Sequence, residues 1–256
     1  MSESKSDLPD EIFGINAKEA YDKVMNAPDK KPEEKLEDKI EKPKPIPINP
    51  IFNPGDYIFL PGHNIYVAKE VTLKGTNWYE AHKEAQKQNA RMITLPEFIE
   101  FLKLLKSGTA KDGLGNKLSV GESTKIDLEI LEKRNPHRGE WLDAKFEEIN
   151  GVLYMNFIHL FNVSTRGKLL PLNKTPLKLD YIMKDCNIDI NSFNIQGLPT
   201  REGDDLHYWC PETGFVAAFG ADIDMAFLNC GRDPEFGKPE FGIRLGFVYG
   251  LHRSSP

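Results

Sequence analysis

Apolar and polar positions follow the periods of strands and helices from about residue 51 onward. The stretches 56–60 (DYIFL) and 64–71 (NIYVAKEV) have the composition of short strands, and Pro61-Gly62 between them marks a turn. Asn77 and Glu80 then have the spacing of a capping box, which satisfies free backbone N–H groups at the start of a helix. The pattern predicts a helix whose apolar face carries Trp78, Ala81 and Ala85.

A second helix start is better formed. Thr94 and Glu97 repeat the capping-box spacing, and Pro96 stands in the first turn, where its missing N–H is tolerated. The glycine-rich run 107–122 is predicted to be a surface loop, and a third helix is expected to follow Ser123 and to run through Leu131. The apolar stripe of the second helix comprises Leu95, Phe98, Ile99, Leu102 and Leu105.

After Pro136 the pattern changes to that of short strands. Segments 141–149 and 152–161 flank Asn150-Gly151, the strongest short signal for a hairpin turn. Helices near the start, followed by many strands, predict an α+β domain with two or three helices, a small twisted, mostly antiparallel sheet and long loops. The further predicted strands are 206–210, 214–220, 225–230 and 241–250.

The first 50 residues have a different composition. Half of residues 27–50 are charged, and residues 1–50 hold seven of the 18 prolines. Such a segment buries too little apolar surface to offset chain entropy, so 1–50 is predicted to be a disordered arm before a domain over 51–256. Residues 16–26 have the spacing of a short amphipathic helix, interpreted either as a weakly ordered tail or as a docking peptide for a partner.

The order of motifs in the domain resembles that of C-type-lectin-type folds over about residues 52–250. Segment 77–102 (NWYEAHKEAQKQNARMITLPEFIEFL) is similar to their first-helix region. Segment 208–248 resembles the branch that holds formylglycine-generating-enzyme-like domains and the variable proteins of diversity-generating retroelements. The chain also resembles variable proteins of archaea and archaeal viruses. The segments that carry this resemblance are WYEAH (78–82), LPEFIEFL (95–102), EWLDA (140–144) and GIRLGF (242–247).

This resemblance implies a C-type-lectin-like fold and a non-enzymatic protein that binds a macromolecular or small ligand. Its recognition surface would lie within about 217–246, where retroelement mutagenesis would diversify some positions. Side chains alternate across a strand, so one set packs inward and the other is displayed, although any half-buried antiparallel sheet shows the same alternation. Phe219, Ala221, Ala226, Leu228 and Cys230 are expected to pack inward. The candidate ligand-binding residues are Gly220, Asp222, Met225, Phe227, Asn229, Gly231, Arg232, Asp233, Phe236 and Gly237.

Charge and hydropathy argue against two classes of protein, those that bind nucleic acids and those that span a membrane. A formal net charge of −6 and a pI near 5.6 argue against non-specific nucleic-acid binding, which requires basic residues to neutralise phosphates. No apolar run approaches the roughly 20 residues of a membrane-spanning helix, and the first residues lack the pattern of a secretory signal. The expectation is a cytoplasmic protein; a structural protein of a virion or cell surface, attached through the arm, is an alternative.

The principal enzymatic alternative is a formylglycine-generating-like oxidoreductase, which requires a close pair of cysteines. Cys210 and Cys230 are twenty positions apart on different predicted strands, where they meet only if those strands are neighbours. With Cys186 they are expected to be buried thiols, and a Cys210–Cys230 bridge is the alternative.

Candidate metal ligands are few. Asp222, Asp224 and Asn229 offer three oxygens, fewer than the six to eight that calcium takes, and solvated loop side chains are the other interpretation. The histidines show no metal-ligand spacing, and His82 and His159 are predicted to be hydrogen-bonded structural residues. The sequence therefore predicts no enzyme, no cofactor and no metal site.

Overall fold

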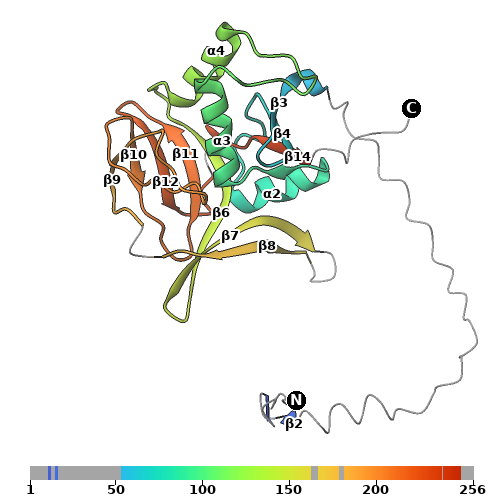
Figure 1. Ribbon diagram of the computed structural model, residues 1–256, viewed down its shortest axis with the longest axis vertical. Helices are drawn as coiled ribbons and strands as arrows, with labels where there is room; N and C mark the ends of the chain where they lie inside the picture. Colours follow the sequence, from blue (N-terminus) through green and yellow to red (C-terminus); the bar gives the residue numbers. More distant parts are fainter. Residues whose placement is uncertain are drawn as a thin grey trace, which may run out of the picture. The chain divides into compact units, whose positions relative to one another are not determined.

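The chain divides into two units, Met1–Ile48 and Asn49–Pro256. The computed structural model describes residues 11–12, 15–16, 53–162, 167–178, 182–237 and 239–248 (Figure 1). In the first unit, β1 (Glu11–Ile12) and β2 (Ile15–Asn16) pair antiparallel. The predicted helix 16–26 lies outside the described residues except for Asn16, which ends β2, and the predicted disorder of the arm also falls outside them.

Both predicted capping boxes begin helices. Asn77 accepts a hydrogen bond from the Glu80 backbone N–H (2.9 Å) at the start of α2 (Trp78–Lys87). Glu97 accepts one from the Thr94 N–H (2.7 Å) at the start of α3 (Leu95–Lys106). None of the helices in the described residues has both the length and the apolar character needed to cross a membrane.

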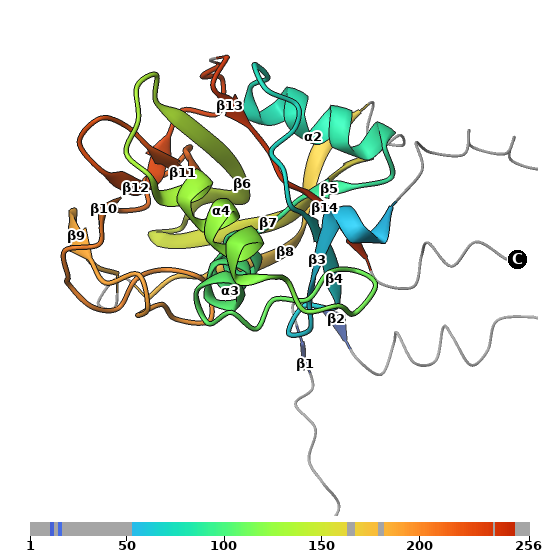
Figure 2. The ribbon, with the colours of Figure 1, turned by 90° about the horizontal axis from the view of Figure 1, so that it is seen from above.

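The third helix begins earlier than predicted. α4 (Val120–Leu131) starts after Ser119, whose hydroxyl accepts a hydrogen bond from the Glu122 N–H (3.2 Å). The predicted start after Ser123 is wrong because Gly121, interpreted as part of the loop, lies in the first helical turn. Figure 2 shows α3 and α4 packed together beside the strands.

The larger sheet has eight strands in the order β8-β7-β6-β11-β12-β10-β9, and β13 pairs with β6. Most pairs are antiparallel as predicted, but β10 with β12 and β13 with β6 are parallel. Asn150 and Gly151 have positive φ in the predicted hairpin turn. The strands are β6 (Arg138–Ile149), β7 (Val152–Asn162), β8 (Lys168–Pro176), β9 (Cys186–Ile188), β10 (Leu206–Trp209), β11 (Val216–Ala221), β12 (Ala226–Arg232) and β13 (Phe241–Gly242).

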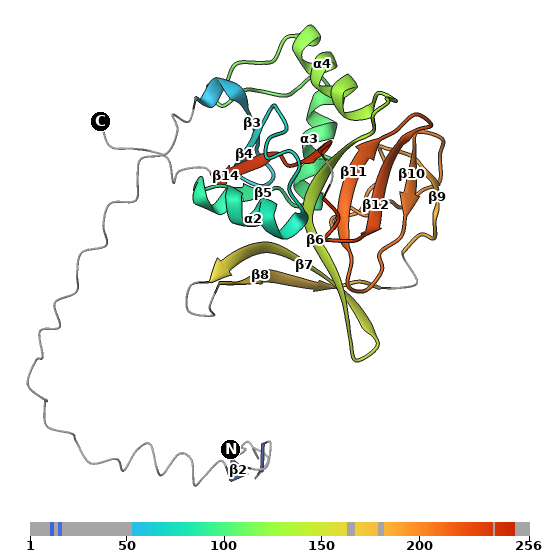
Figure 3. The ribbon, with the colours of Figure 1, turned by 180° about the vertical axis from the view of Figure 1, so that it is seen from behind.

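The expectation of one small sheet is therefore wrong, and within the larger sheet β8 and β9 are the strands that were not predicted. Pro171 and Pro176 obscure β8, but they are tolerated there because β8 is an edge strand. Figure 3 shows the long β6–β7 hairpin on one side of the sheet, with β11, β12, β10 and β9 following side by side.

A second sheet has four antiparallel strands in the order β3-β4-β14-β5. The predicted strand 241–250 is broken, because β13 joins the larger sheet whereas β14 joins the smaller one. Ile243, between them, pairs with Thr72. The remaining bounds are η1 (Pro54–Asp56), β3 (Tyr57–Leu60), β4 (Ile65–Ala68), β5 (Arg91–Met92) and β14 (Leu245–Val248).

The apolar side chains form two buried clusters. The larger contains Phe98, Leu102 and the inner face of β11 and β12, and the smaller surrounds Trp78, Trp141 and Phe241. The residues with the strongest apolar periodicity, Trp78, Phe98, Leu102, Ile243 and Leu245, are all at most 5% exposed. Burial of these apolar surfaces supplies the main driving force for this fold.

Candidate functional site

β11 and β12 carry much of the segment in which the recognition surface is predicted. The side chains expected to pack inward do so: Phe219, Ala221, Ala226, Leu228 and Cys230 are buried in the larger cluster. Phe219 pairs with Leu228 and Ala221 with Ala226, so the same face of both strands is packed. The opposite face of the two strands is then the one that can display side chains.

Two of the candidate residues on that opposite face are covered. Phe227 is only 5% exposed, because the Trp209 ring from β10 lies against it with centroids 5.5 Å apart. Gly220 is buried opposite Phe227, and a Cβ there would lie 2.6 Å from the Phe227 ring. The expectation that both are displayed is therefore wrong, since a neighbouring strand supplies the outer layer.

The accessible part of this face comes from β10, β12 and β9. His207 and Trp209 are partly exposed, and their rings are in edge-to-face contact at 4.4 Å. His207 Nδ1 hydrogen-bonds Asn187 Oδ1 (2.9 Å), and the partly exposed Asn229 is the register partner of Trp209. The alternation in LHYWC (206–210), with Leu206 and Tyr208 buried, is the signal that could have identified His207 and Trp209.

The other candidate residues lie at the two ends of β12. At one end, Asp222 Oδ1 accepts hydrogen bonds from the N–H groups of Asp224 and Met225 (both 2.9 Å) and so shapes a tight turn. At the other end lies the loop that follows Arg232. The seven residues of β12 hold the ends about 20 Å apart, so the ten candidates do not form one site.

The loop after β12 is partly packed. The Arg232 guanidinium lies over the ring of Phe236 (4.0 Å) and near that of Phe241 (5.0 Å). Burial lowers the pKa of Arg232. Asp233 and Gly237 are exposed, whereas Gly231 and Phe236 are partly buried. Phe236 contributes to the smaller core, so it is a supporting rather than a displayed residue.

A buried polar cluster joins three residues that are distant in sequence. Asp143 on β6 accepts hydrogen bonds from the His159 backbone N–H (2.9 Å) and bonds His159 Nδ1 (2.5 Å). His82 Nε2 on α2 lies 3.7 Å from the same carboxylate and has no hydrogen-bond partner among the described residues. His159 is thus hydrogen-bonded as predicted, whereas for His82, also predicted to be hydrogen-bonded, Nε2 is left without a partner among the described residues. Ile158, next to His159, has a φ of 57°, a strained value for a β-branched residue.

The three potential ligand atoms of this cluster lie within 4.8 Å of one another, close enough to suggest a metal site. Ligands of one tetrahedral zinc ion are separated by about 3.3 Å, given bonds of about 2.0–2.1 Å. The 2.5 Å separation between Asp143 and His159 is instead that of a hydrogen bond. Burial opposes the charge of Asp143, but His82 and His159 outweigh it and lower the pKa of this carboxyl. We therefore assign a hydrogen-bonded pair with His82 beside it.

His82 should make the fold acid-sensitive. Burial lowers the pKa of His82 from 6.5 to about 4, against the opposing effect of Asp143. Between these pH values the unfolded chain binds a proton that the folded chain does not, so stability falls by roughly 3 kcal/mol as the pH drops from 6.5 to 4. Urea unfolding of His82→Gln should show a shallower pH dependence over this interval. His63→Gln, at an exposed histidine, is the control. An unchanged slope in His82→Gln would contradict the assignment.

The three cysteines are free thiols; Cys230 is buried as expected, whereas Cys186 and Cys210 are only partly buried. β10, which Cys210 directly follows, is the parallel neighbour of β12, which contains Cys230. Burial is the main reason that the pKa of the Cys230 thiol is raised. Burial is also the main reason that the pKa of the Cys210 thiol is raised to about 11. Thiolates are scarce at such pKa values, which disfavours a nucleophilic role at neutral pH.

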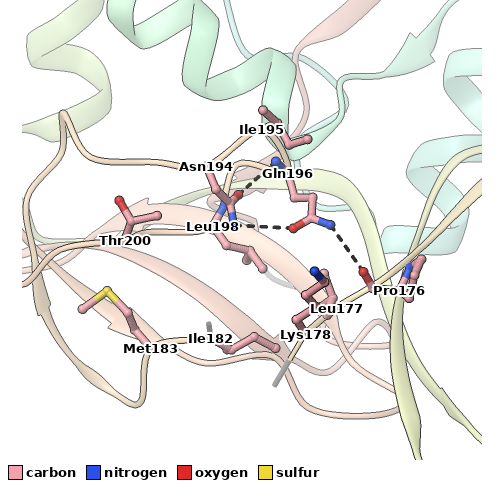
Figure 4. A pocket seen from close by; sticks show the side chains of 10 residues that line it. All are labelled: Pro176, Leu177, Lys178, Ile182, Met183, Asn194, Ile195, Gln196, Leu198 and Thr200. Carbon is pink, nitrogen blue, oxygen red and sulfur yellow. Dashed lines mark hydrogen bonds between the residues drawn. The ribbon is translucent and has the colours of Figure 1, made fainter. Parts of the chain in front are cut away.

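A hollow of about 650 Å³ lies between the end of β8 and the loop that precedes β10 (Figure 4). Its apolar lining includes Leu177, Ile182 and Leu198, and the amides of Asn194 and Gln196 lie at one side. Gln196 donates to the Pro176 carbonyl (3.4 Å), which ties this loop to β8. None of the ten candidate residues lines the hollow.

The three candidate calcium ligands do not form a site. Asp222 caps its own turn, and Asn229 Oδ1 accepts a hydrogen bond from the Gly231 N–H (2.8 Å).

No family model matches the chain, and neither a curated protein nor a solved structure matches it.

Proposed function

We propose that the protein is a non-enzymatic ligand-binding protein that recognises its ligand on the outer face of β10 and β12. The observation that carries the proposal is the difference in burial between the two faces of the sheet. The inner face of β12 is buried, whereas Asn229 on its outer face lies beside the partly exposed Trp209. Such a face can bind a partner without disturbing the core.

The chemistry of this face suits a ligand with a flat or apolar group flanked by hydrogen-bonding atoms. Trp209 and His207 offer ring surfaces, and Phe227 supports the Trp209 ring from below. The amides of Asn187 and Asn229 flank the rings. Aromatic anchors surrounded by polar groups are typical of the energetic centre of a recognition surface.

The resemblance to retroelement variable proteins supports the same region. The fold would keep the inner residues of β12 constant, while outer positions such as Asn229 change with the ligand. The turn at 222–225 and the exposed Asp233, at opposite ends of β12, would take part only with a ligand large enough to reach beyond this face. We propose a C-type-lectin-like fold on the same basis.

The test compares the two faces of one strand. The protein would be screened on a glycan array and against a displayed peptide library, and each hit would be titrated against the parent and Trp209→Ala/Asn229→Ala. Loss of an aromatic anchor should weaken binding about 30-fold or more. Leu228→Ala, on the inner face, should instead lower the melting temperature.

A parent that binds no probe saturably, or an outer-face variant that keeps the parent's affinity, would overturn the proposal. Trp209→Phe/Asn229→Asp keeps a ring and a polar group at the two positions. It should retain part of the binding, which separates a recognition role from a structural one.

A further inference from the structure

A second hollow, of about 610 Å³, lies where the loop after α4 meets the start of β6. Four cationic side chains line it, Lys74, Lys133, Arg134 and Arg138, together with the carboxylates of Glu132 and Glu240. Four positive and two negative charges leave a formal excess of +2 around the hollow. In a chain with a net charge of −6, this is a local reversal of sign.

The positive charge continues into the interior. Glu140, 1% exposed, accepts two hydrogen bonds from Arg244 (2.9 and 3.0 Å) and is also ion-paired with Arg138. One buried carboxylate thus pairs with two buried guanidinium groups. The network of Glu140, Arg138 and Arg244 therefore carries a formal net charge of +1. An uncompensated buried charge is costly, so this network favours an anion nearby.

Two buried donor nitrogens beside the hollow have no hydrogen-bond partner among the described residues. Arg138, 8% exposed, lines the hollow, and its buried Nε has no hydrogen-bond partner. The buried Nε of Arg134 has none either, while its backbone N–H holds the Asp222 carbonyl (2.7 Å). Lys74 and Lys133 are exposed and form no ion pair within the described residues. Arg134 also pairs with Glu132 (3.7 Å) and Arg138 with Glu140, so the hollow gathers two guanidinium groups that each already share a carboxylate, and two amines without an ion pair in the described residues.

We propose that this hollow binds a phosphate or sulfate group. Its donors come from separate segments, the loop before α2 and the loop between α4 and β6, so they approach a bound group from several directions. A tetrahedral oxyanion presents oxygens in those directions, and arginine and lysine are the side chains that recognise it. The recognition face on β10 and β12 is a different surface, and the two proposals can fail independently.

The test measures thermal unfolding of the full chain in inorganic phosphate, sulfate, acetate and chloride at matched ionic strength. Phosphate or sulfate at about ten times its dissociation constant should raise the melting temperature by about 3 °C over chloride. Lys133→Gln/Arg134→Gln should abolish that rise. Lys83→Gln/Lys106→Gln, which removes the same charge from exposed positions elsewhere, should keep it.

A variant that binds phosphate more tightly gives a second test, because a misfolded protein would bind phosphate less tightly. Glu240→Gln removes a carboxylate from the lining and should tighten phosphate binding several-fold in isothermal titration. Equal melting temperatures in phosphate, sulfate and chloride, or a phosphate effect that survives in Lys133→Gln/Arg134→Gln, would overturn the proposal. Equal stabilisation by acetate would overturn the assignment to a tetrahedral group.

Discussion

Replacing Glu140 by glutamine is expected to destabilise the protein by about 3–5 kcal/mol, because it leaves buried charges without a partner. Arg244 is fully buried, and its guanidinium binds both oxygens of Glu140. Burial opposes the charge of this carboxylate, but Arg244 and Arg138 outweigh it and lower the pKa of Glu140. A neutral amide keeps the shape of the side chain but removes the only carboxylate that the network contains.

Urea denaturation at neutral pH measures this effect, with Glu84→Gln as control. Glu84 forms an exposed ion pair with Lys87 (2.6 Å), and breaking such a pair costs less than about 1 kcal/mol. Glu140→Gln/Arg138→Gln, which removes one positive charge as well, should recover part of the loss. A cost for Glu140→Gln no larger than that of Glu84→Gln would show that the two arginines are solvated.

Local signals predicted the elements that depend on local chemistry. The Asn77–Glu80 and Thr94–Glu97 boxes place the starts of α2 and α3, because a cap satisfies N–H groups within a single turn. Asn150-Gly151 likewise fixes the turn between β6 and β7. α4 was placed late because its first turn contains a glycine, which propensity assigns to loops.

Strands that form only through pairing with distant segments were harder to predict from the sequence. β8 contains two prolines and becomes a strand through its pairing with β7. The same limit applies to the candidate site. Alternation assigned Phe227 to the displayed face, but it could not show that Trp209 of a parallel neighbour would cover it. The pairs Asp143–His159 and Glu140–Arg244 are contacts between distant segments, and no spacing rule in one sequence reveals them.

Truncating Trp78 to alanine is the second large effect that we expect, at about 3–5 kcal/mol. Trp78 is 0% exposed, and its ring packs edge-to-face against His82 (4.2 Å) and His159 (5.0 Å). Its indole N–H donates to the Leu142 carbonyl (3.0 Å), which would lose its partner. Tyr79→Ala, at the partly exposed neighbour on α2, should cost less because it opens no internal cavity.

The same substitution has a second readout in the ionisation of His82. The low pKa of His82, about 4, arises chiefly from burial, to which the Trp78 ring contributes. Removing the ring admits water, which favours the charged imidazolium, so the pKa of His82 in Trp78→Ala should rise toward 6.5. NMR titration of the histidine ring protons measures it, with Trp78→Phe, which keeps an aromatic ring over His82, expected to hold the pKa close to that of the parent. A Trp78→Ala protein with parental stability and an unshifted His82 would mean that Trp78 does not close this part of the core.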